Sequence, residues 1–127
     1  TLYESIKMIQ NENVKVIRQN SIHQIGMYCT QRIEGDEIMD WSKSSRELFN
    51  FIRAICKPGP GARTVVNGVE MIINNSEMIA DAPRYIGISG AVVRVSVDSF
   101  VVKTNDSSIR ITDYVYDGKI RMGDRLG

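Results

Sequence analysis

The chain has 127 residues, with 16 basic and 15 acidic side chains, a net charge of +1 and a pI of about 7.7. This length suits one domain with a hydrophobic core, because a chain of this size buries roughly two thirds of its surface on folding. The balanced charge gives no strong indication of a nucleic-acid or anionic-membrane partner, and no apolar run is long enough to cross a bilayer. The chain starts with Thr1 inside a helical pattern, so we expect it to be part of a longer protein.

The two cysteines, Cys29 and Cys56, form neither a CxxC pair nor a disulfide framework. Both have apolar sequence neighbours. We therefore expect buried free thiols in the reducing cytoplasm.

Residues 1–18 are predicted to be helical, because Leu2, Ile6 and Ile9 follow helical spacing and Thr1 with Glu4 can form a capping box. The polar residues 11–13 interrupt this pattern, so residues 14–16 are either helical or a short extended piece. Residues 20–26 are a connector with the only histidine, His23. No acid or thiol stands at ligand spacing from it, which favours a structural role over metal binding or catalysis.

Residues 27–33 alternate weakly and predict a strand or an extended arm. Four carboxylates follow in seven residues around Gly35, at positions Glu34, Asp36, Glu37 and Asp40. Carboxylates so close together can hold a cation or perform acid–base chemistry, but this spacing is not that of a calcium loop and favours a solvated turn. Trp41 anchors either a partner or, as we expect, the domain's own core.

A helix over residues 44–56 is the clearest single element. Ser44 and Glu47 form a capping box, and Leu48, Ile52 and Ile55 form an apolar stripe. The Lys57-Pro58 pair ends this helix, and the Pro-Gly-Pro-Gly run forms a rigid turn.

After this turn the apolar period changes to two. Residues 64–66 and 69–73 flank Asn67-Gly68, the typical signal of a tight β-hairpin. Three more strands are predicted over residues 91–97, 100–104 and 108–115, and the tail from Tyr116 is expected to be frayed or helical. The fold class is therefore α+β: an N-terminal helical segment and one amphipathic helix, followed by a small five-stranded OB-like β-barrel over residues 62–116.

The sequence contains no glycine-rich phosphate loop and no nucleophile elbow. A small barrel can instead bind single-stranded nucleic acid through aromatic and basic residues. The available residues for such a surface are Tyr85, Phe100, Tyr114, Tyr116, Arg84, Arg94, Lys103 and Arg110.

Several short motifs resemble the C-terminal region of the 10-formyltetrahydrofolate-dependent formyltransferases, which include methionyl-tRNA formyltransferases and nucleotide-amino-sugar N-formyltransferases. They are Tyr28-Cys29, Ile38-Met39-Asp40-Trp41-Ser42, Phe51-Ile52-Arg53-Ala54, Lys57-Pro58-Gly59-Pro60-Gly61-Ala62, Asn67-Gly68 and Gly87-x-x-Gly90-x-Val92. The resemblance covers nearly the whole chain. It departs from the family wording at Met39, which stands where an isoleucine precedes the aspartate.

The resemblance implies that residues 1–25 are a linker or terminal helix of a missing catalytic domain and that residues 26–127 are the C-terminal domain. It implies a cytoplasmic parent enzyme that uses 10-formyltetrahydrofolate, whereas this chain alone holds no cofactor and is inactive. The candidates for contact with the catalytic domain or the substrate are Tyr28, Asp40, Trp41, Arg53, Lys57, Pro60 and Gly61.

The implied partners are a Rossmann-like catalytic domain of the same parent and an amine acceptor. The small net charge and the Lys57–Gly61 turn favour a nucleotide-linked amino sugar over tRNA. An accessory formyltransferase domain predicts an exposed apolar patch around Trp41. The alternatives are an independent nucleic-acid-binding barrel and a homodimerisation module.

Overall fold

The chain forms two units, residues 1–32 and residues 33–127. The structure is a computed structural model that describes residues 1–26 and 28–127. The first unit holds α1 (Leu2–Gln10) and the short 3-10 helix η1 (Gln19–Ser21), and neither helix has a buried residue. Within the described residues, no helix is long and apolar enough to cross a membrane.

Helix α1 is shorter than the predicted helix over residues 1–18. It ends at Gln10, and Glu12 then adopts a positive φ of 53° that an α-helix cannot continue through. Residues 14–16 and 28–33 form neither a helix nor a strand, which rules out the helical alternative for the first segment and the strand alternative for the second; Met27 lies outside the described residues.

The second unit begins with α2 (Ser45–Ile55), which confirms the predicted helix within a residue at each end. The Ser44 hydroxyl accepts a hydrogen bond from the Glu47 amide, and the Glu47 carboxylate accepts one from the Ser44 amide. This reciprocal pair satisfies two backbone donors at the start of the helix. Leu48 and Ile52 are buried beneath α2, as their spacing predicts.

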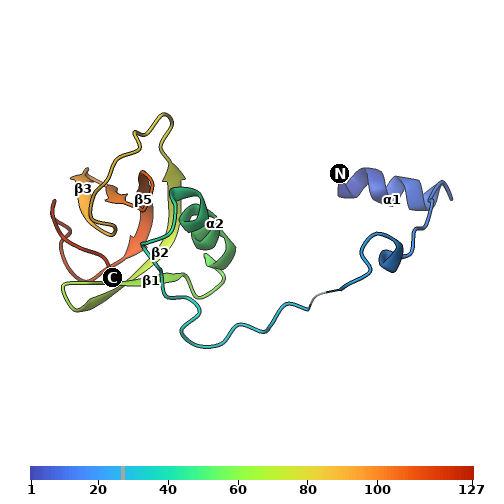
Figure 1. The fold of residues 1–127 in the computed structure, drawn as a ribbon, viewed down its shortest axis with the longest axis horizontal. Coiled ribbons are helices and arrows are strands. Elements are labelled where there is room, and N and C mark those ends of the chain that lie inside the picture. The colour runs from blue at the N-terminus through green and yellow to red at the C-terminus, as the bar shows by residue number, and fades with distance from the viewer. Residues whose placement is uncertain (27) are drawn as a thin grey trace. The chain divides into compact units, whose positions relative to one another are not determined.

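Five strands form one antiparallel sheet in the order β1-β2-β5-β4-β3 (Figure 1). They are β1 (Ala62–Val66), β2 (Val69–Met78), β3 (Val92–Val95), β4 (Phe100–Lys103) and β5 (Ser108–Val115). Asn67 and Gly68 both have positive φ, 51° and 81°, as a two-residue hairpin between β1 and β2 requires. The five predicted strands are therefore confirmed, with β3 shorter than expected and β2 longer, because it continues from the predicted end at residue 73 to Met78.

The strands do not close into the predicted OB-like barrel, because β1 and β3 are both edges and do not pair with each other. The C-terminal segment lies between these edges. Gly127 donates to the Val65 carbonyl at 2.9 Å and Leu126 donates to the Gly90 carbonyl at 2.9 Å. Ile120 and Leu126 are buried. The prediction of a frayed or helical tail is thus wrong, since this segment pairs with both sheet edges.

The core lies between α2, the segment before it and the sheet. Its members are Met39, Trp41, Leu48, Ile52, Ala62, Val66, Met71, Ile73, Val92, Phe100, Val102, Ile109, Ile111, Ile120 and Leu126. Neither cysteine belongs to it. Cys29 is exposed, and Cys56 is only partly covered at the end of α2, where its thiol donates to the Arg53 carbonyl at 3.3 Å. The expected burial of both thiols is therefore wrong.

Candidate functional site

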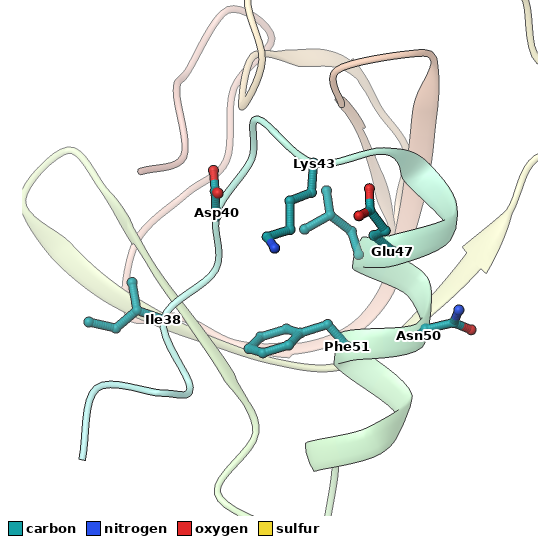
Figure 2. A pocket seen from close by; sticks show the side chains of 7 residues that line it. Ile38, Asp40, Lys43, Glu47, Asn50 and Phe51 are labelled. Carbon is teal, nitrogen blue, oxygen red and sulfur yellow. The ribbon is translucent and has the colours of Figure 1, made fainter. Parts of the chain in front are cut away.

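A groove of about 430 Å³ lies between α2 and the segment that leads into it. Its walls are Ile38, Asp40 and Lys43 from that segment and Glu47, Leu48, Asn50 and Phe51 from α2 (Figure 2). Its volume is in the range of ordinary ligand and peptide pockets. This groove includes Asp40, one of the residues that the sequence singled out.

Hydrogen bonds within this segment fix the position of Asp40. Its Oδ1 accepts from the Ser42 hydroxyl at 2.6 Å and from the Ser42 amide at 3.0 Å, and its carbonyl accepts from the Lys43 amide at 3.1 Å. The Ser42 hydroxyl, then the Ser42 amide, hold the pKa of Asp40 below its usual value. Asp40 is therefore an ionised carboxylate held in one orientation at the groove.

Glu47 is the second carboxylate of the groove. The Ser44 hydroxyl, then the Ser44 amide, lower the pKa of Glu47 below its usual value, and the nearby Lys43 charge adds to the shift. Figure 2 shows Asp40 and Glu47 on either side of the Lys43 side chain, with Phe51 beneath them. Two carboxylates and one ammonium give the groove a net negative charge over an apolar floor.

Trp41 does not line the groove; it belongs to the core and is 5% exposed. Its Nε1 donates to Thr64 Oγ1 on β1 at 3.0 Å. This satisfies the indole donor inside the core, as burial of a tryptophan requires. The expectation that Trp41 packs on its own core is confirmed, and the expected exposed patch is not centred on Trp41.

The Lys57–Gly61 turn is held by backbone hydrogen bonds to the end of α2. Gly59 donates to the Cys56 carbonyl and Gly61 to the Ile55 carbonyl, both at 2.8 Å. Gly61 has a φ of 77°, and a Cβ there would lie 2.4 Å from Ile72 Cγ2. Glycine is therefore required at this position. Lys57 is exposed and Pro60 half-buried.

The seven candidate residues do not gather into one site. Asp40 lines the groove, Arg53 lies on the exposed side of α2, and Lys57, Pro60 and Gly61 form the turn after it. Tyr28 is fully exposed and belongs to the first unit. Their roles in contact with another domain or a substrate stay predictions.

The exposed side of α2 carries a cluster that the sequence reading did not identify: Arg46, Phe49 and Arg53. The guanidinium carbons of Arg46 and Arg53 lie 5.8 Å and 5.6 Å from the centroid of the Phe49 ring. Their i, i+3 and i+7 spacing is the signal that could have revealed this cluster. Neither arginine has a carboxylate within salt-bridge distance in the described part of the chain.

The structure weakens the predicted nucleic-acid surface on the sheet. Phe100 and Lys103 are buried, each 1% exposed, and Arg110 forms an ion pair with Glu77 at 3.4 Å. Lys103 Nζ donates to the carbonyls of Thr104 and Asn105 and lies over the Tyr85 ring, so this cation is not available to a ligand. Only part of the expected residue set can therefore face a nucleic acid.

The sequence suggested a solvated carboxylate-rich turn around Gly35. In the structure this turn is only partly solvated. Glu37 is buried, and its Oε1 lies 3.7 Å from Arg63 Nε.

Among the described residues, no group of three or more His, Cys, Asp and Glu side chains could hold a metal ion. A reduced folate carries carboxylates of its own, so Asp40 and Glu47 would repel it from the groove. The groove does not fit that cofactor.

Comparison with known proteins identifies the second unit. The model of the family described as "Formyl transferase, C-terminal domain" matches residues 33–125, well over half of the chain. The chain belongs to this family. The resemblance stated from the sequence motifs is thereby confirmed at the level of the family.

Among its relatives are methionyl-tRNA formyltransferases from several bacteria. That of Alkaliphilus oremlandii is 31% identical over 124 residues, which are 98% of this chain and 38% of the relative. That of Bacillus subtilis is 38% identical over 87 residues, 68% of this chain and 26% of the relative. That of Syntrophomonas wolfei is 28% identical over 116 residues, 91% of this chain and 35% of the relative. The chain thus spans about a third of the length of these relatives.

One solved structure, HypX from Aquifex aeolicus, is similar in fold. It has a TM-score of 0.54 and 18% sequence identity, over 92% of this chain and 20% of HypX. At this identity the likeness concerns the fold alone.

Proposed function

We propose that this chain is the accessory C-terminal domain of a formyltransferase whose catalytic portion belongs to a longer parent protein. The family match over residues 33–125 carries the proposal. The relatives, which are about three times as long, support it. In this proposal residues 1–25 link the two portions, and the chain alone transfers no formyl group.

The parent transfers a formyl group from 10-formyltetrahydrofolate to an amine. The printed names of the relatives favour the amine of methionyl-tRNA as the acceptor. No relative reported above is named for an amino sugar, so the preference inferred from charge and the Lys57–Gly61 turn has no support there. A nucleotide-linked amino sugar is kept as the second acceptor in the experiment.

The cluster of Arg46, Phe49 and Arg53 on α2 provides a contact for the phosphates of a tRNA acceptor. The guanidinium groups of Arg46 and Arg53 both lie over the Phe49 ring, which gathers two positive charges on one face of α2. Guanidinium groups bind phosphates in a bidentate manner, and such contacts dominate the affinity for nucleic acids. Arg53, together with Lys57 at the end of the helix, would then face the acceptor, as the sequence motifs suggested.

This contact predicts a specific salt dependence. The 127-residue chain is titrated against an unmodified initiator tRNA at several salt concentrations. The association constant K falls as salt rises, so the slope of log K against log salt is negative. The double variant Arg46→Ala/Arg53→Ala should make this slope shallower by roughly 1.5, because each lost phosphate contact removes about 0.7–0.9. Arg110→Ala, which removes an arginine already paired with Glu77, is the matched control and should change the slope little.

Formyl transfer itself is tested with the parent and the 127-residue chain side by side. Each is incubated with 10-formyltetrahydrofolate and either methionyl-tRNA or a nucleotide-linked amino sugar, and formylated product is measured by mass spectrometry. The proposal expects product from the parent alone, with methionyl-tRNA. A parent that formylates neither acceptor would refute the proposed function.

A further inference from the structure

The groove between α2 and residues 38–43 exposes apolar side chains to water in a concave surface. Ile38 is 65% exposed at its rim, and Phe51 is only half-buried, so an apolar strip is open to water. Leu48 forms the base of the strip. An uncovered concave apolar strip of this kind is typical of a docking surface.

Charge narrows the choice of occupant. Asp40 and Glu47 flank the strip, both are held ionised by serine hydrogen bonds, and Lys43 is the only cation among the lining residues. The groove therefore repels phosphates and carboxylates and attracts a cation that carries apolar surface. A polypeptide segment with a Lys or Arg beside apolar side chains has this chemistry.

A second argument concerns where such a segment comes from. The chain spans about a third of its relatives, so most of a parent of similar length lies outside it. Surfaces between domains of one chain are commonly of mixed polarity, with apolar and charged contacts together. The groove has this mixed character.

We propose that this groove is the docking surface for a basic, apolar segment of the catalytic portion of the same parent chain. This segment places an apolar side chain against Ile38 and Phe51 and a Lys or Arg beside the carboxylates of Asp40 and Glu47, whose combined charge Lys43 alone does not neutralise. The inference rests on the part of the proposed function that assigns a catalytic portion to the parent. It adds which face of this domain meets that portion and what chemistry the meeting segment has.

The test is cysteine accessibility at the groove rim. Ile38→Cys is introduced into the full-length parent and into the 127-residue chain, and the rate of maleimide labelling is measured by mass spectrometry of the tryptic peptide 33–43, which has no native cysteine. Val97→Cys, at the fully exposed turn after β3, is the matched control, read in the cysteine-free peptide 95–103. Docking predicts labelling of Ile38→Cys about tenfold slower or more in the parent, because the tethered segment acts at a millimolar effective concentration.

A charge variant tests the basic character of the segment. Asp40→Asn/Glu47→Gln keeps an acceptor oxygen for the Ser42 and Ser44 hydrogen bonds and removes only the two negative charges. In the parent it should speed labelling of Ile38→Cys by about fivefold, in line with the loss of two exposed ion pairs. Asp113→Asn, which removes an exposed charge on β5, should leave the rate unchanged.

Equal labelling of Ile38→Cys in the parent and in the chain would overturn the inference. Protection of the chain alone that grows with its concentration would also overturn it, since a second copy would then occupy the groove. Protection that Asp40→Asn/Glu47→Gln leaves intact would contradict a basic occupant. These readouts do not depend on activity: formylation without protection refutes this inference alone, and protection without formylation refutes the proposed reaction alone.

Discussion

Asp106 links the turn between β4 and β5 to the first turn of α2. Its Oδ1 accepts a hydrogen bond from the Ser45 amide at 2.8 Å, and from the hydroxyls of Ser45 and Thr104 at 3.1 Å each. The carboxylate thus satisfies a backbone donor of the helix and opposes the positive end of its dipole. We predict that Asp106→Ala destabilises the second unit more than the loss of any other exposed or half-buried aspartate.

The magnitude follows from the contacts that are lost. A hydrogen bond to a charged group contributes about 1.5–3 kcal/mol, and removal of a helix cap costs about 0.5–2 kcal/mol. Because these terms describe overlapping contacts, the expected loss is about 2–3 kcal/mol, or a fall of roughly 1–2 M in the urea midpoint at an ordinary denaturant dependence. Trp41, the only tryptophan, is buried in this unit, so its fluorescence reports the transition directly.

The control is Asp113→Ala, which removes an exposed aspartate from β5. Asp106→Asn separates charge from shape and should cost about half as much, since its amide oxygen still accepts from Ser45. A midpoint for Asp106→Ala that equals the midpoint for Asp113→Ala would show that the Asp106 carboxylate does not stabilise the start of α2.

The same carboxylate predicts a pH dependence. The Ser45 amide, above all, holds the pKa of Asp106 below its usual value. A depressed folded-state pKa stabilises the fold above the unfolded pKa of about 3.9, and this contribution disappears as the pH falls through the folded value. The stability difference between the wild type and Asp106→Ala should therefore be constant from about pH 5 to 8 and shrink below about pH 4. A difference that grows on acidification would contradict this sign.

Two further substitutions test the core and the turn. Trp41→Phe removes the indole donor to Thr64 and should lower the free energy of unfolding by about 1–3 kcal/mol, because a buried hydroxyl acceptor loses its partner. The loss is measured by far-UV circular dichroism in urea, and an unchanged midpoint would show that this bond contributes nothing. Gly61→Ala should destabilise the fold clearly more than Gly35→Ala. Both glycines have positive φ, but only a Cβ at Gly61 would meet another side chain, 2.4 Å from Ile72 Cγ2. Equal losses of stability would show that backbone conformation alone sets the cost.

The elements that the sequence predicted well depend on local signals. The capping box of Ser44 and Glu47 sets the start of α2, and Asn67-Gly68 sets the first hairpin, each within a few residues of chain. Strand periodicity then located all five strands. Such signals need no knowledge of the rest of the fold.

The features that the sequence did not predict depend on contacts between distant residues. Ser45 and Asp106 are separated by 61 positions, and no local pattern marks Asp106 as a partner of α2. The burial of Lys103 depends on carbonyls of the following turn and on the Tyr85 ring from a long connection. The order of the C-terminal tail has the same origin, because it comes from pairing with β1 and with the residues around β3, far away in sequence.

The candidate site was predictable only in part. The motif around Asp40 and Trp41 pointed to the right segment, but the alternation along it places Asp40 at the groove and Trp41 in the core. Ile38, Lys43 and Phe51 complete the groove only after α2 packs beside this segment. The sequence resemblance correctly indicated the family, whereas the amino-sugar preference drawn from the net charge and the Lys57–Gly61 turn has no support in the names of the relatives given above.

An accessory role of this domain is tested most directly by formyl transfer to methionyl-tRNA by the parent with and without residues 33–127. Binding of 10-formyltetrahydrofolate is measured on both proteins to confirm that the catalytic portion is folded. We expect that the truncated parent still binds the donor but forms N-formylmethionyl-tRNA with a strongly reduced kcat/KM. Unchanged kcat/KM in the truncated protein would contradict an accessory role for this domain.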